Sequence, residues 1–260
     1  MMKFGFCDLA VVPVRREPSD KAEMSTQLLF GDVMEVSGQE GSWLNIKILF
    51  DGYEGWVETK QIREIDEDEF QRLSASNVFV NSKLYGDSVL QNGQTIMLPS
   101  GCSFYNLNNQ LMVIGGQEYL IDGTVYPFEF KGYDALLKTA NEYLSCPYLW
   151  GGKTYLGLDC SGLTQVVYKQ HGISLLRDAA QQAGQGEQIS FLSDGLPGDL
   201  LFFDNEDGKI VHVGILLSDQ LLLHCSGKVR IDYIDHQGIY NRESNKYTHS
   251  LRMIRRMTRI

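Results

Sequence analysis

The chain has 260 residues, of which 43% are hydrophobic and 22% charged; this is the composition of globular domains and excludes a disordered or fibrous chain. Its length indicates one large domain or several small ones. The 33 acidic and 23 basic residues give a formal net charge of −10, which argues against nucleic-acid binding and a polybasic membrane contact.

The start of the chain and its cysteines bear on its compartment. Residues 1–18 contain no sustained apolar segment, so we expect no signal peptide, and no apolar run is long enough to span a membrane. The five cysteines are odd in number and form no C-x-x-C motif, which favours reduced thiols over a disulfide framework. We therefore expect a cytoplasmic protein that has no membrane partner.

Residues 1–65 have the pattern of short strands separated by turns. Residues 43–50 alternate apolar and polar side chains, Asp51-Gly52 is typical of a hairpin turn, and residues 53–57 are the expected return strand. This pattern predicts a small all-β domain. The tryptophans expected in its core are Trp43 and Trp56.

The next two segments differ in composition. Residues 66–77 are acidic and polar, and we interpret them as a solvated linker with room for a helical turn. Residues 78–126 return to short apolar runs separated by turns rich in glycine and asparagine. Two small SH3-sized barrels over residues 1–65 and 78–126 are the simplest interpretation.

After residue 126 helical periodicity replaces the short strands. Residues 133–144 place apolar side chains on one helical face, and a second helical period begins at Leu163. Beyond Pro197-Gly198 the chain alternates again as strands. Helices followed by an antiparallel sheet predict an α+β domain over residues 127–260.

Cys160 lies where the second of these helices is expected to begin. Asp159 is a good N-cap residue directly before the apolar helical period, which places Cys160 in the first turn. The helix dipole and the unpaired backbone N–H groups there favour the thiolate, which is the nucleophilic form. We expect the other cysteines to be small buried hydrophobes: Cys7, Cys102, Cys146 and Cys225.

A nucleophilic thiol needs a base, and two histidines lie in predicted neighbouring strands. His212 lies within residues 210–215 and His224 within 220–225, so both imidazoles are able to meet one thiol, with His224 orienting His212. A zinc site of His212, His224 and Cys225 is the alternative, but adjacent strand residues point to opposite faces. We expect neither a metal nor another cofactor. The histidines expected to be solvated are His171, His236 and His249.

These motifs resemble a known family. Pro147-Tyr-Leu-Trp-Gly-Gly152, Asp159-Cys-Ser-Gly162 and His212-Val-Gly-Ile215, with His224 after them, resemble the NlpC-type papain-like cysteine peptidases of bacterial cell-wall metabolism. Residues 52–57, Gly-Tyr-Glu-Gly-Trp-Val, are similar to bacterial SH3-like domains. Two such domains before this catalytic domain resemble the γ-D-glutamyl-L-diamino acid endopeptidases of the dipeptidyl-peptidase VI type.

The resemblance implies a function and a set of roles. The implied reaction is hydrolysis of the γ-D-Glu–diamino acid bond in murein stem peptides with a free N-terminal L-Ala, which releases L-Ala-γ-D-Glu for cell-wall recycling. Cys160 is implied as nucleophile, His212 as base, His224 as orienting residue and Tyr148 as part of the oxyanion site. The residues implied to contact substrate are Asp159, Ser161, Asp178, Glu23 and Tyr53. We expect a monomer whose partner is a murein-derived peptide.

Several alternatives stay open. Asp159, Ser161 and Asp178 are equally compatible with helix capping, and Glu23 and Tyr53 with surface charge and barrel packing. A general peptidoglycan hydrolase, an amidase or acyltransferase of the same fold, and a non-enzymatic wall-binding protein are competing functions. The combination of a cysteine, two histidines and a tyrosine argues against a pure binding module. The third substrate residue, diaminopimelate or Lys, is not predicted.

Overall fold

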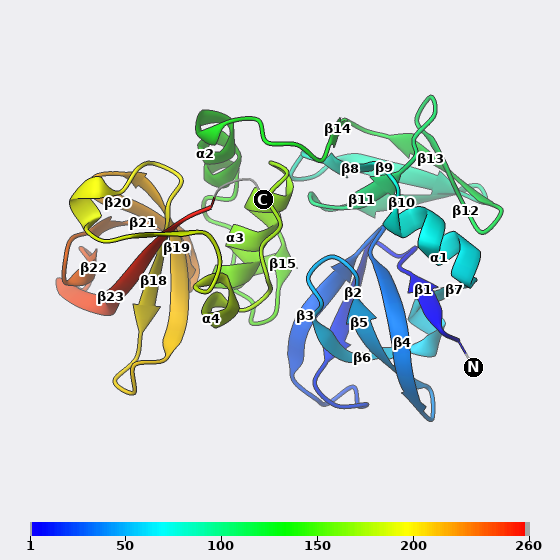
Figure 1. The fold of residues 1–260 in the computed structure, drawn as a ribbon, viewed down its shortest axis with the longest axis horizontal. Coiled ribbons are helices and arrows are strands. Elements are labelled where there is room, and N and C mark those ends of the chain that lie inside the picture. Colours follow the sequence, from blue (N-terminus) through cyan, green and yellow to red (C-terminus); the bar gives the residue numbers. More distant parts are fainter. Residues whose placement is uncertain (1, 258–260) are drawn as a thin grey trace. The chain divides into compact units, whose positions relative to one another are not determined.

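The computed structural model describes residues 2–257, and the chain divides into two compact units, Met1–Phe128 and Glu129–Ile260 (Figure 1). The N-terminal unit consists of β-sheets and one helix. The C-terminal unit contains three helices followed by an antiparallel sheet. Within residues 2–257, no helix is both long enough and apolar enough to cross a bilayer.

The first part of the N-terminal unit is a seven-stranded sheet with the order β3-β2-β6-β5-β4-β1-β7. The predicted alternation is confirmed, because Leu44, Ile46 and Ile48 are buried on one face of β5. Trp43 and Trp56, which we expected in the core, lie on the outer face of β5 and β6 and are only partly buried. The strands are β1 (Phe4–Phe6), β2 (Val11–Arg15), β3 (Met24–Leu29), β4 (Val33–Glu40), β5 (Trp43–Ile48), β6 (Glu54–Glu58) and β7 (Arg63–Ile65), with a short 3-10 turn at Thr59–Gln61.

The segment interpreted as a solvated linker contains a packed helix, α1 (Glu67–Ser74). Asp66 caps it, because its side chain accepts a hydrogen bond from the backbone N–H of Glu69 at 2.8 Å. Phe70 and Leu73 are buried, and the Phe70 ring stacks on Phe4 with centroids 4.3 Å apart. These two apolar residues, one turn apart in an acidic segment, bury one face of the helix.

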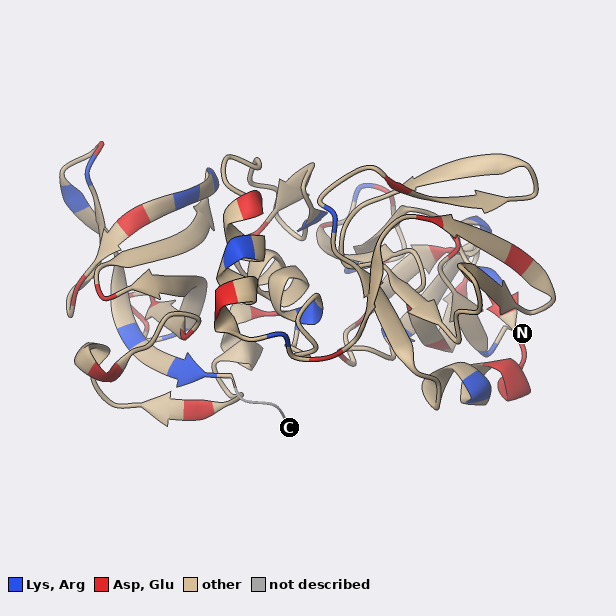
Figure 2. Cartoon of the chain, turned by 90° about the horizontal axis from the view of Figure 1, so that it is seen from above, with Lys and Arg blue, Asp and Glu red and all other residues tan. Residues whose placement is uncertain are grey.

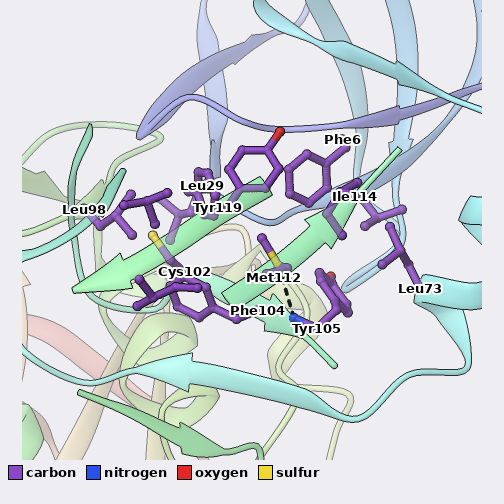
Figure 3. Packing of buried hydrophobic residues seen from close by; sticks show 14 of the residues in the cluster. Phe6, Leu29, Leu73, Leu98, Cys102, Phe104, Tyr105, Met112, Ile114 and Tyr119 are labelled. Atoms are coloured by element: carbon purple, nitrogen blue, oxygen red, sulfur yellow. Dashed lines mark hydrogen bonds between the residues drawn. The ribbon is translucent and has the colours of Figure 1, made fainter. Parts of the chain in front are cut away.

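Residues 78–127 form a four-stranded sheet, β10-β9-β13-β12, and a three-stranded sheet, β11-β8-β14. They share a core with the first sheet, in which Phe6 packs against Tyr119 with ring centroids 5.9 Å apart (Figure 3). Phe30 also packs there against Phe104 and Tyr119, at centroid distances of 5.9 and 5.5 Å. The N-terminal unit therefore has two apolar clusters, one shared between the first sheet and residues 78–127 and one within the first sheet. The strands are β8 (Val78–Asn81), β9 (Asp87–Gln91), β10 (Gln94–Leu98), β11 (Ser103–Tyr105), β12 (Leu111–Ile114), β13 (Gln117–Asp122) and β14 (Val125–Pro127).

The C-terminal unit packs helices against a sheet that closes on itself. The strand order is β17-β23-β18-β19-β20-β21-β22, and β22 also pairs with β23. Apolar side chains such as Leu201, Leu222 and Ile254 fill one core of this unit. The strands are β15 (Lys153–Thr154), β16 (Gly157–Leu158), β17 (Glu187–Ile189), β18 (Leu200–Asp204), β19 (Ile210–Ser218), β20 (Leu221–Ser226), β21 (Lys228–Ile234), β22 (Gly238–Asn241) and β23 (Lys246–Arg256).

The helices of this unit are α2 (Tyr133–Glu142), α3 (Cys160–Lys169) and α4 (Ala179–Gln182), and a 3-10 turn covers Leu192–Asp194. The predicted amphipathic pattern of α2 is confirmed, with Leu136 and Ala140 buried. Its exposed face carries Asp134, Lys138 and Glu142 one turn apart (Figure 2). Every residue of α3 is buried, and α3 contacts α2, β19 and β20, so this helix is the centre of the unit.

Candidate active site

Cys160 is the first residue of the buried helix α3, as the sequence predicted. Asp159 is the N-cap, and its Oδ1 accepts a hydrogen bond from the backbone N–H of Gly162 at 2.6 Å. The thiol is 8% exposed, and backbone N–H groups of Val213 and Ser161 form hydrogen bonds to it. Since Val213 directly follows His212, this hydrogen bond joins the thiol to the strand that carries the histidine, β19.

The expected thiolate is not the resting form of Cys160. Burial, together with the negative charge of Asp159, raises the pKa of the Cys160 thiol to about 12, although the two backbone hydrogen bonds lower it. The prediction of a lowered pKa was wrong because it counted the helix N-terminus and not the loss of water around the sulfur. The thiol is therefore protonated at neutral pH and requires a base to become nucleophilic.

His212 and His224 come together from neighbouring strands β19 and β20. His212 Nε2 lies 2.8 Å from His224 Nδ1, and the two rings are nearly perpendicular, at 87°. His224 pairs with Gly214, where a Cβ atom would lie 3.0 Å from the His224 Cβ, so glycine leaves room for this side chain. Burial, followed by the charges of His224 and His249, holds the pKa of His212 well below its usual range. His212 is therefore neutral and able to accept a proton.

Two charged residues that the sequence reasoning did not identify extend this hydrogen-bonded pair. Asp232 on β21 accepts from His224, with Oδ2 3.0 Å from the His224 Nε2 atom. Arg230 holds the same carboxylate, with Nη2 2.9 Å from Oδ1 and Nε 2.7 Å from Oδ2. The β20–β21 hairpin pairs Leu222 with Asp232 and His224 with Arg230, which places these residues on the face of His224. The alternation of side chains along residues 228–234 was the available signal for these two residues. Using it would have required the register of the β20–β21 hairpin.

His249, expected to be solvated, lies on β23 and stacks on His212. The two ring centroids are 4.3 Å apart and the planes differ by 24°. Burial is the main reason that the pKa of His249 is lowered to about 4. His171, also expected to be solvated, is 3% exposed and contacts the hydroxyl of Thr139 at 2.9 Å. The expectation was wrong for His171, because helix packing covers it, whereas His249 is partly exposed.

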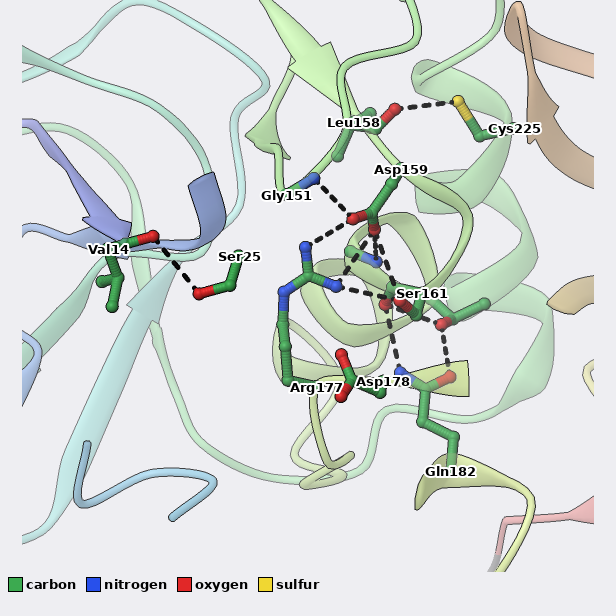
Figure 4. A network of polar contacts seen from close by, with 12 residues as sticks. Val14, Ser25, Gly151, Leu158, Asp159, Ser161, Arg177, Asp178, Gln182 and Cys225 are labelled. Atoms are coloured by element: carbon green, nitrogen blue, oxygen red, sulfur yellow. Dashed lines mark hydrogen bonds and ion pairs between the residues drawn. The ribbon is translucent and has the colours of Figure 1, made fainter. Parts of the chain in front are cut away.

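Asp159 and Ser161 belong to a buried polar network around the start of α3 (Figure 4). Arg177 contacts Asp159 with both terminal nitrogens, Nη1 to Oδ1 at 3.0 Å and Nη2 to Oδ2 at 2.6 Å. Its Nη1 also donates to the Ser161 hydroxyl at 2.9 Å, and the Gly151 N–H donates to Asp159 Oδ2 at 2.9 Å. Capping and charge pairing are thus observed for Asp159, and Arg177 is a residue that the sequence reasoning passed over.

Tyr148 and Asp178 flank this network. Burial, followed by the charges of Cys160 and Asp159, raises the pKa of Tyr148 to about 12, so its phenol is protonated at neutral pH. Tyr148 is 37% exposed. Asp178 is the N-cap residue of α4, and its backbone N–H donates to the Gln181 side chain at 2.9 Å. The capping alternative for Asp178 therefore has structural support, while its contact with substrate stays a prediction.

Glu23 and Tyr53 lie in the N-terminal unit. Glu23 is exposed and forms an ion pair with Arg16, whose Nε is 3.3 Å from Oε2. Tyr53 directly precedes β6, is partly buried, and packs against the apolar core of the first sheet. Surface charge and barrel packing are thus observed for these residues, and their contact with substrate stays a prediction.

The arrangement around Cys225 differs from the zinc alternative. Cys225 Sγ donates a hydrogen bond to the carbonyl oxygen of Leu158 at 3.1 Å, away from the partners of His224. Over residues 2–257, no group of three or more His, Cys, Asp or Glu side chains is placed to hold a metal ion. All five cysteines are free thiols.

A protonated thiol at a helix start and a neutral imidazole that is hydrogen-bonded to a second histidine fit a hydrolase of the cysteine-nucleophile class. Comparison with known proteins agrees. Residues 145–250 match the NlpC/P60 family, and residues 14–62 match the bacterial dipeptidyl-peptidase Sh3 domain. The chain therefore carries an NlpC/P60 domain behind a bacterial dipeptidyl-peptidase SH3 domain, and it is a cysteine peptidase.

Two curated proteins and one crystal structure show how far the similarity extends. The γ-D-glutamyl-L-lysine dipeptidyl-peptidase of Bacillus subtilis (strain 168) is 29% identical over 215 residues, covering 77% of this chain and 72% of that protein. Dipeptidyl-peptidase 6 of Lysinibacillus sphaericus is 25% identical over 245 residues, covering 85% and 88%. An NlpC/P60 family protein from Bacillus cereus ATCC 10987 has the same fold, with a TM-score of 0.81 at 20% identity, covering 98% of this chain and 99% of that one.

Proposed function

We propose that this chain hydrolyses the γ-D-glutamyl–L-diamino acid bond of murein stem peptides that begin with a free L-Ala, releasing L-Ala-γ-D-Glu for cell-wall peptide recycling. The observation that carries the proposal is the buried thiol of Cys160, hydrogen-bonded to the backbone of the residue after His212, together with the hydrogen-bonded pair of His212 and His224. The name of the similar Bacillus subtilis protein, γ-D-glutamyl-L-lysine dipeptidyl-peptidase, supplies the substrate class. In this proposal the first 126 residues form two SH3-like domains, and an α+β peptidase domain follows.

The proposed reaction begins with a neutral thiol and a neutral base. His212 takes the thiol proton of Cys160 as the sulfur attacks the γ-carbonyl carbon, and Tyr148 helps to stabilise the oxyanion of the tetrahedral intermediate. His212 then gives the proton to the departing amine of the diamino acid, leaving a thioester. Water, deprotonated by His212, hydrolyses the thioester and restores the thiol. His224 keeps the His212 ring in place throughout.

The proposed substrate contacts fall into two groups. Asp159, Ser161 and Asp178 would contact the D-Glu and diamino acid parts, and the cap and ion pair of Asp159 would hold this end of the site rigid. Glu23 and Tyr53 would contact the N-terminal L-Ala, because an anionic side chain suits a free α-ammonium group.

The test is incubation with L-Ala-γ-D-Glu-diaminopimelate and, separately, with the lysine tripeptide, followed by mass spectrometry. We expect release of L-Ala-γ-D-Glu from at least one of them. Cys160→Ala removes the nucleophile and should abolish release, whereas the matched variant Cys146→Ala, which changes a partly exposed thiol, should stay close to wild type. No release by wild type from either peptide, or turnover by Cys160→Ala above a tenth of the wild-type rate, would contradict the proposal.

The competing function is hydrolysis of intact peptidoglycan. Comparing free tripeptide, N-acetylated tripeptide and intact sacculi under one condition separates the two. Comparable cleavage of all three would favour general wall hydrolysis over recycling.

A further inference from the structure

A continuous line of buried hydrogen bonds leads away from the catalytic histidine. His212 Nε2 is 2.8 Å from His224 Nδ1, and His224 Nε2 is 3.0 Å from Asp232 Oδ2. His212, His224 and Asp232 are 5%, 1% and 6% exposed, so water does not compete freely for these contacts. Each atom in the line therefore has to act as donor or acceptor toward its neighbour.

The carboxylate decides the direction of every bond in this line. Burial alone would raise the pKa of Asp232, but the hydrogen bonds from His224 and Arg230 outweigh it and the pKa is lowered, so the group is ionised at neutral pH. An ionised carboxylate only accepts, so a His224 ring with a single proton must carry that proton on Nε2. His224 Nδ1 then carries a lone pair, so His212 must donate from Nε2. The free lone pair of neutral His212 lies on Nδ1, the nitrogen that His224 does not engage.

We propose that Asp232, held by Arg230, is a positioning residue that fixes the tautomers of both catalytic-site histidines and so keeps His212 Nδ1 as the base. This inference rests on the proposed roles of Cys160 and His212 and extends them by two residues. Asp232 does not take the catalytic proton. When His212 becomes an imidazolium, its Nε2–H still points to His224, and the Asp232 charge stabilises the cation through that ring.

Other side chains pack against this line of hydrogen bonds. His249 stacks on His212 from β23, and its centroid is 6.1 Å from that of His224. Arg230 approaches Asp232 from the same strand, and its Nη1 also lies 3.2 Å from Glu243 Oε2. The Glu243 side chain is 74% exposed, so this second acidic partner of Arg230 offers a matched control that lies outside the line.

The first experiment is nitrogen NMR of the wild-type protein labelled with ¹⁵N-histidine, which reports the tautomer of each ring without substrate. We expect His224 and His212 both to carry hydrogen on Nε2 at pH 7. A proton on Nδ1 of His224, or a mixture of tautomers at either ring, would overturn the proposal. This measurement needs no variant, so a folding defect cannot mask the answer.

The second experiment compares Asp232→Asn with Glu243→Gln. Asparagine keeps the shape of aspartate but both donates and accepts, so the tautomers should become mixed in the NMR spectrum. Removing the charged partner of a catalytic histidine costs about 10⁴-fold in kcat in a serine protease. Because the His224 ring separates Asp232 from His212, we expect Asp232→Asn to lose about 10- to 100-fold in kcat, with little change in KM. Glu243→Gln should stay within about twofold, because the pair it loses is exposed. Equal kcat for wild type and Asp232→Asn would refute the proposal.

The rate of Cys160 alkylation by iodoacetamide, followed by peptide mass spectrometry, separates this inference from the proposed substrate. If wild type fails to cleave the tripeptides, the proposed function is wrong, but the alkylation rate still reports the base. We expect Asp232→Asn to slow alkylation of Cys160 at pH 7 and to leave that of Cys146 unchanged. Unchanged alkylation of both thiols would count against the role of Asp232 whatever the substrate is.

Discussion

Replacing Arg177 by Met tests how the start of α3 is held. The Arg177 side chain is 1% exposed and that of Asp159 is 8% exposed, and two contacts of 3.0 and 2.6 Å join them. Methionine retains the apolar stem but leaves the Asp159 carboxylate buried without its cation. Breaking a buried ion pair in this way costs about 3–5 kcal/mol. The variant also removes a donor to the Ser161 hydroxyl.

Hydrogen exchange of the α3 amides measures this cost within the C-terminal unit, because protection reports the free energy of local or global opening. A loss of about 3–5 kcal/mol corresponds to exchange that is faster by about two to three and a half orders of magnitude. The matched control is Arg252→Met, whose pair with Asp204 is long, at 3.7 Å, and has a 60% exposed arginine side chain. An exposed pair of this kind contributes less than about 1 kcal/mol.

A second substitution tests the cause. Adding Asp159→Asn to Arg177→Met removes the uncompensated charge, so we expect α3 protection to recover in part. Two results would refute the view that the buried charge pair holds the helix start. One is a further loss of α3 protection on adding Asp159→Asn, and the other is an effect of Arg177→Met no larger than that of Arg252→Met.

Three further predictions concern the catalytic histidines, the buried His171 and the exposed Glu23. His212→Ala should reduce kcat/KM nearly as much as loss of the thiol, whereas His224→Asn should keep partial activity because an amide still orients an imidazole. Equal and complete loss of activity in both variants, when both fold, would contradict the separate roles of base and orienting residue. Burial lowers the pKa of His171 to about 4, so the unfolded state binds a proton that the folded state does not, and stability should fall as pH drops from 6.5 towards 4. His171→Gln should flatten that slope in urea titrations, and an unchanged slope would count against it. Glu23→Gln should lower kcat/KM about ten- to a hundredfold, and N-acetylation of the substrate at least as much; no change in tripeptide kinetics would exclude the proposed contact with the ammonium group.

What the sequence predicted at the site came from local patterns. Asp159 before an apolar helical period indicates a helix start, and the structure begins α3 at Cys160. Alternation around His212 and His224 indicates two strands, and the structure pairs them as neighbours. Each of these inferences uses residues within a few positions of one another, where side-chain periodicity directly reflects the backbone conformation.

The missed residues depend on pairing between distant segments. Arg177 reaches Asp159 from a loop after the helix, Asp232 reaches His224 through the register of a hairpin, and His249 reaches His212 from the last strand. No local period reports such contacts. The pKa of Cys160 was missed for the same reason, because desolvation is set by the elements that cover the thiol.

Burial keeps the reacting groups of the C-terminal unit neutral at rest, while the fixed charges near them are paired. Both carboxylates next to these groups are held by arginine, Asp159 by Arg177 and Asp232 by Arg230. A buried carboxylate without a cation costs several kcal/mol, so each arginine makes its fixed charge tolerable. The thiol of Cys160 and its base meanwhile carry no charge until the sulfur attacks. The charges therefore form only along the reaction, when the Asp232 carboxylate is already in place to stabilise the imidazolium through His224.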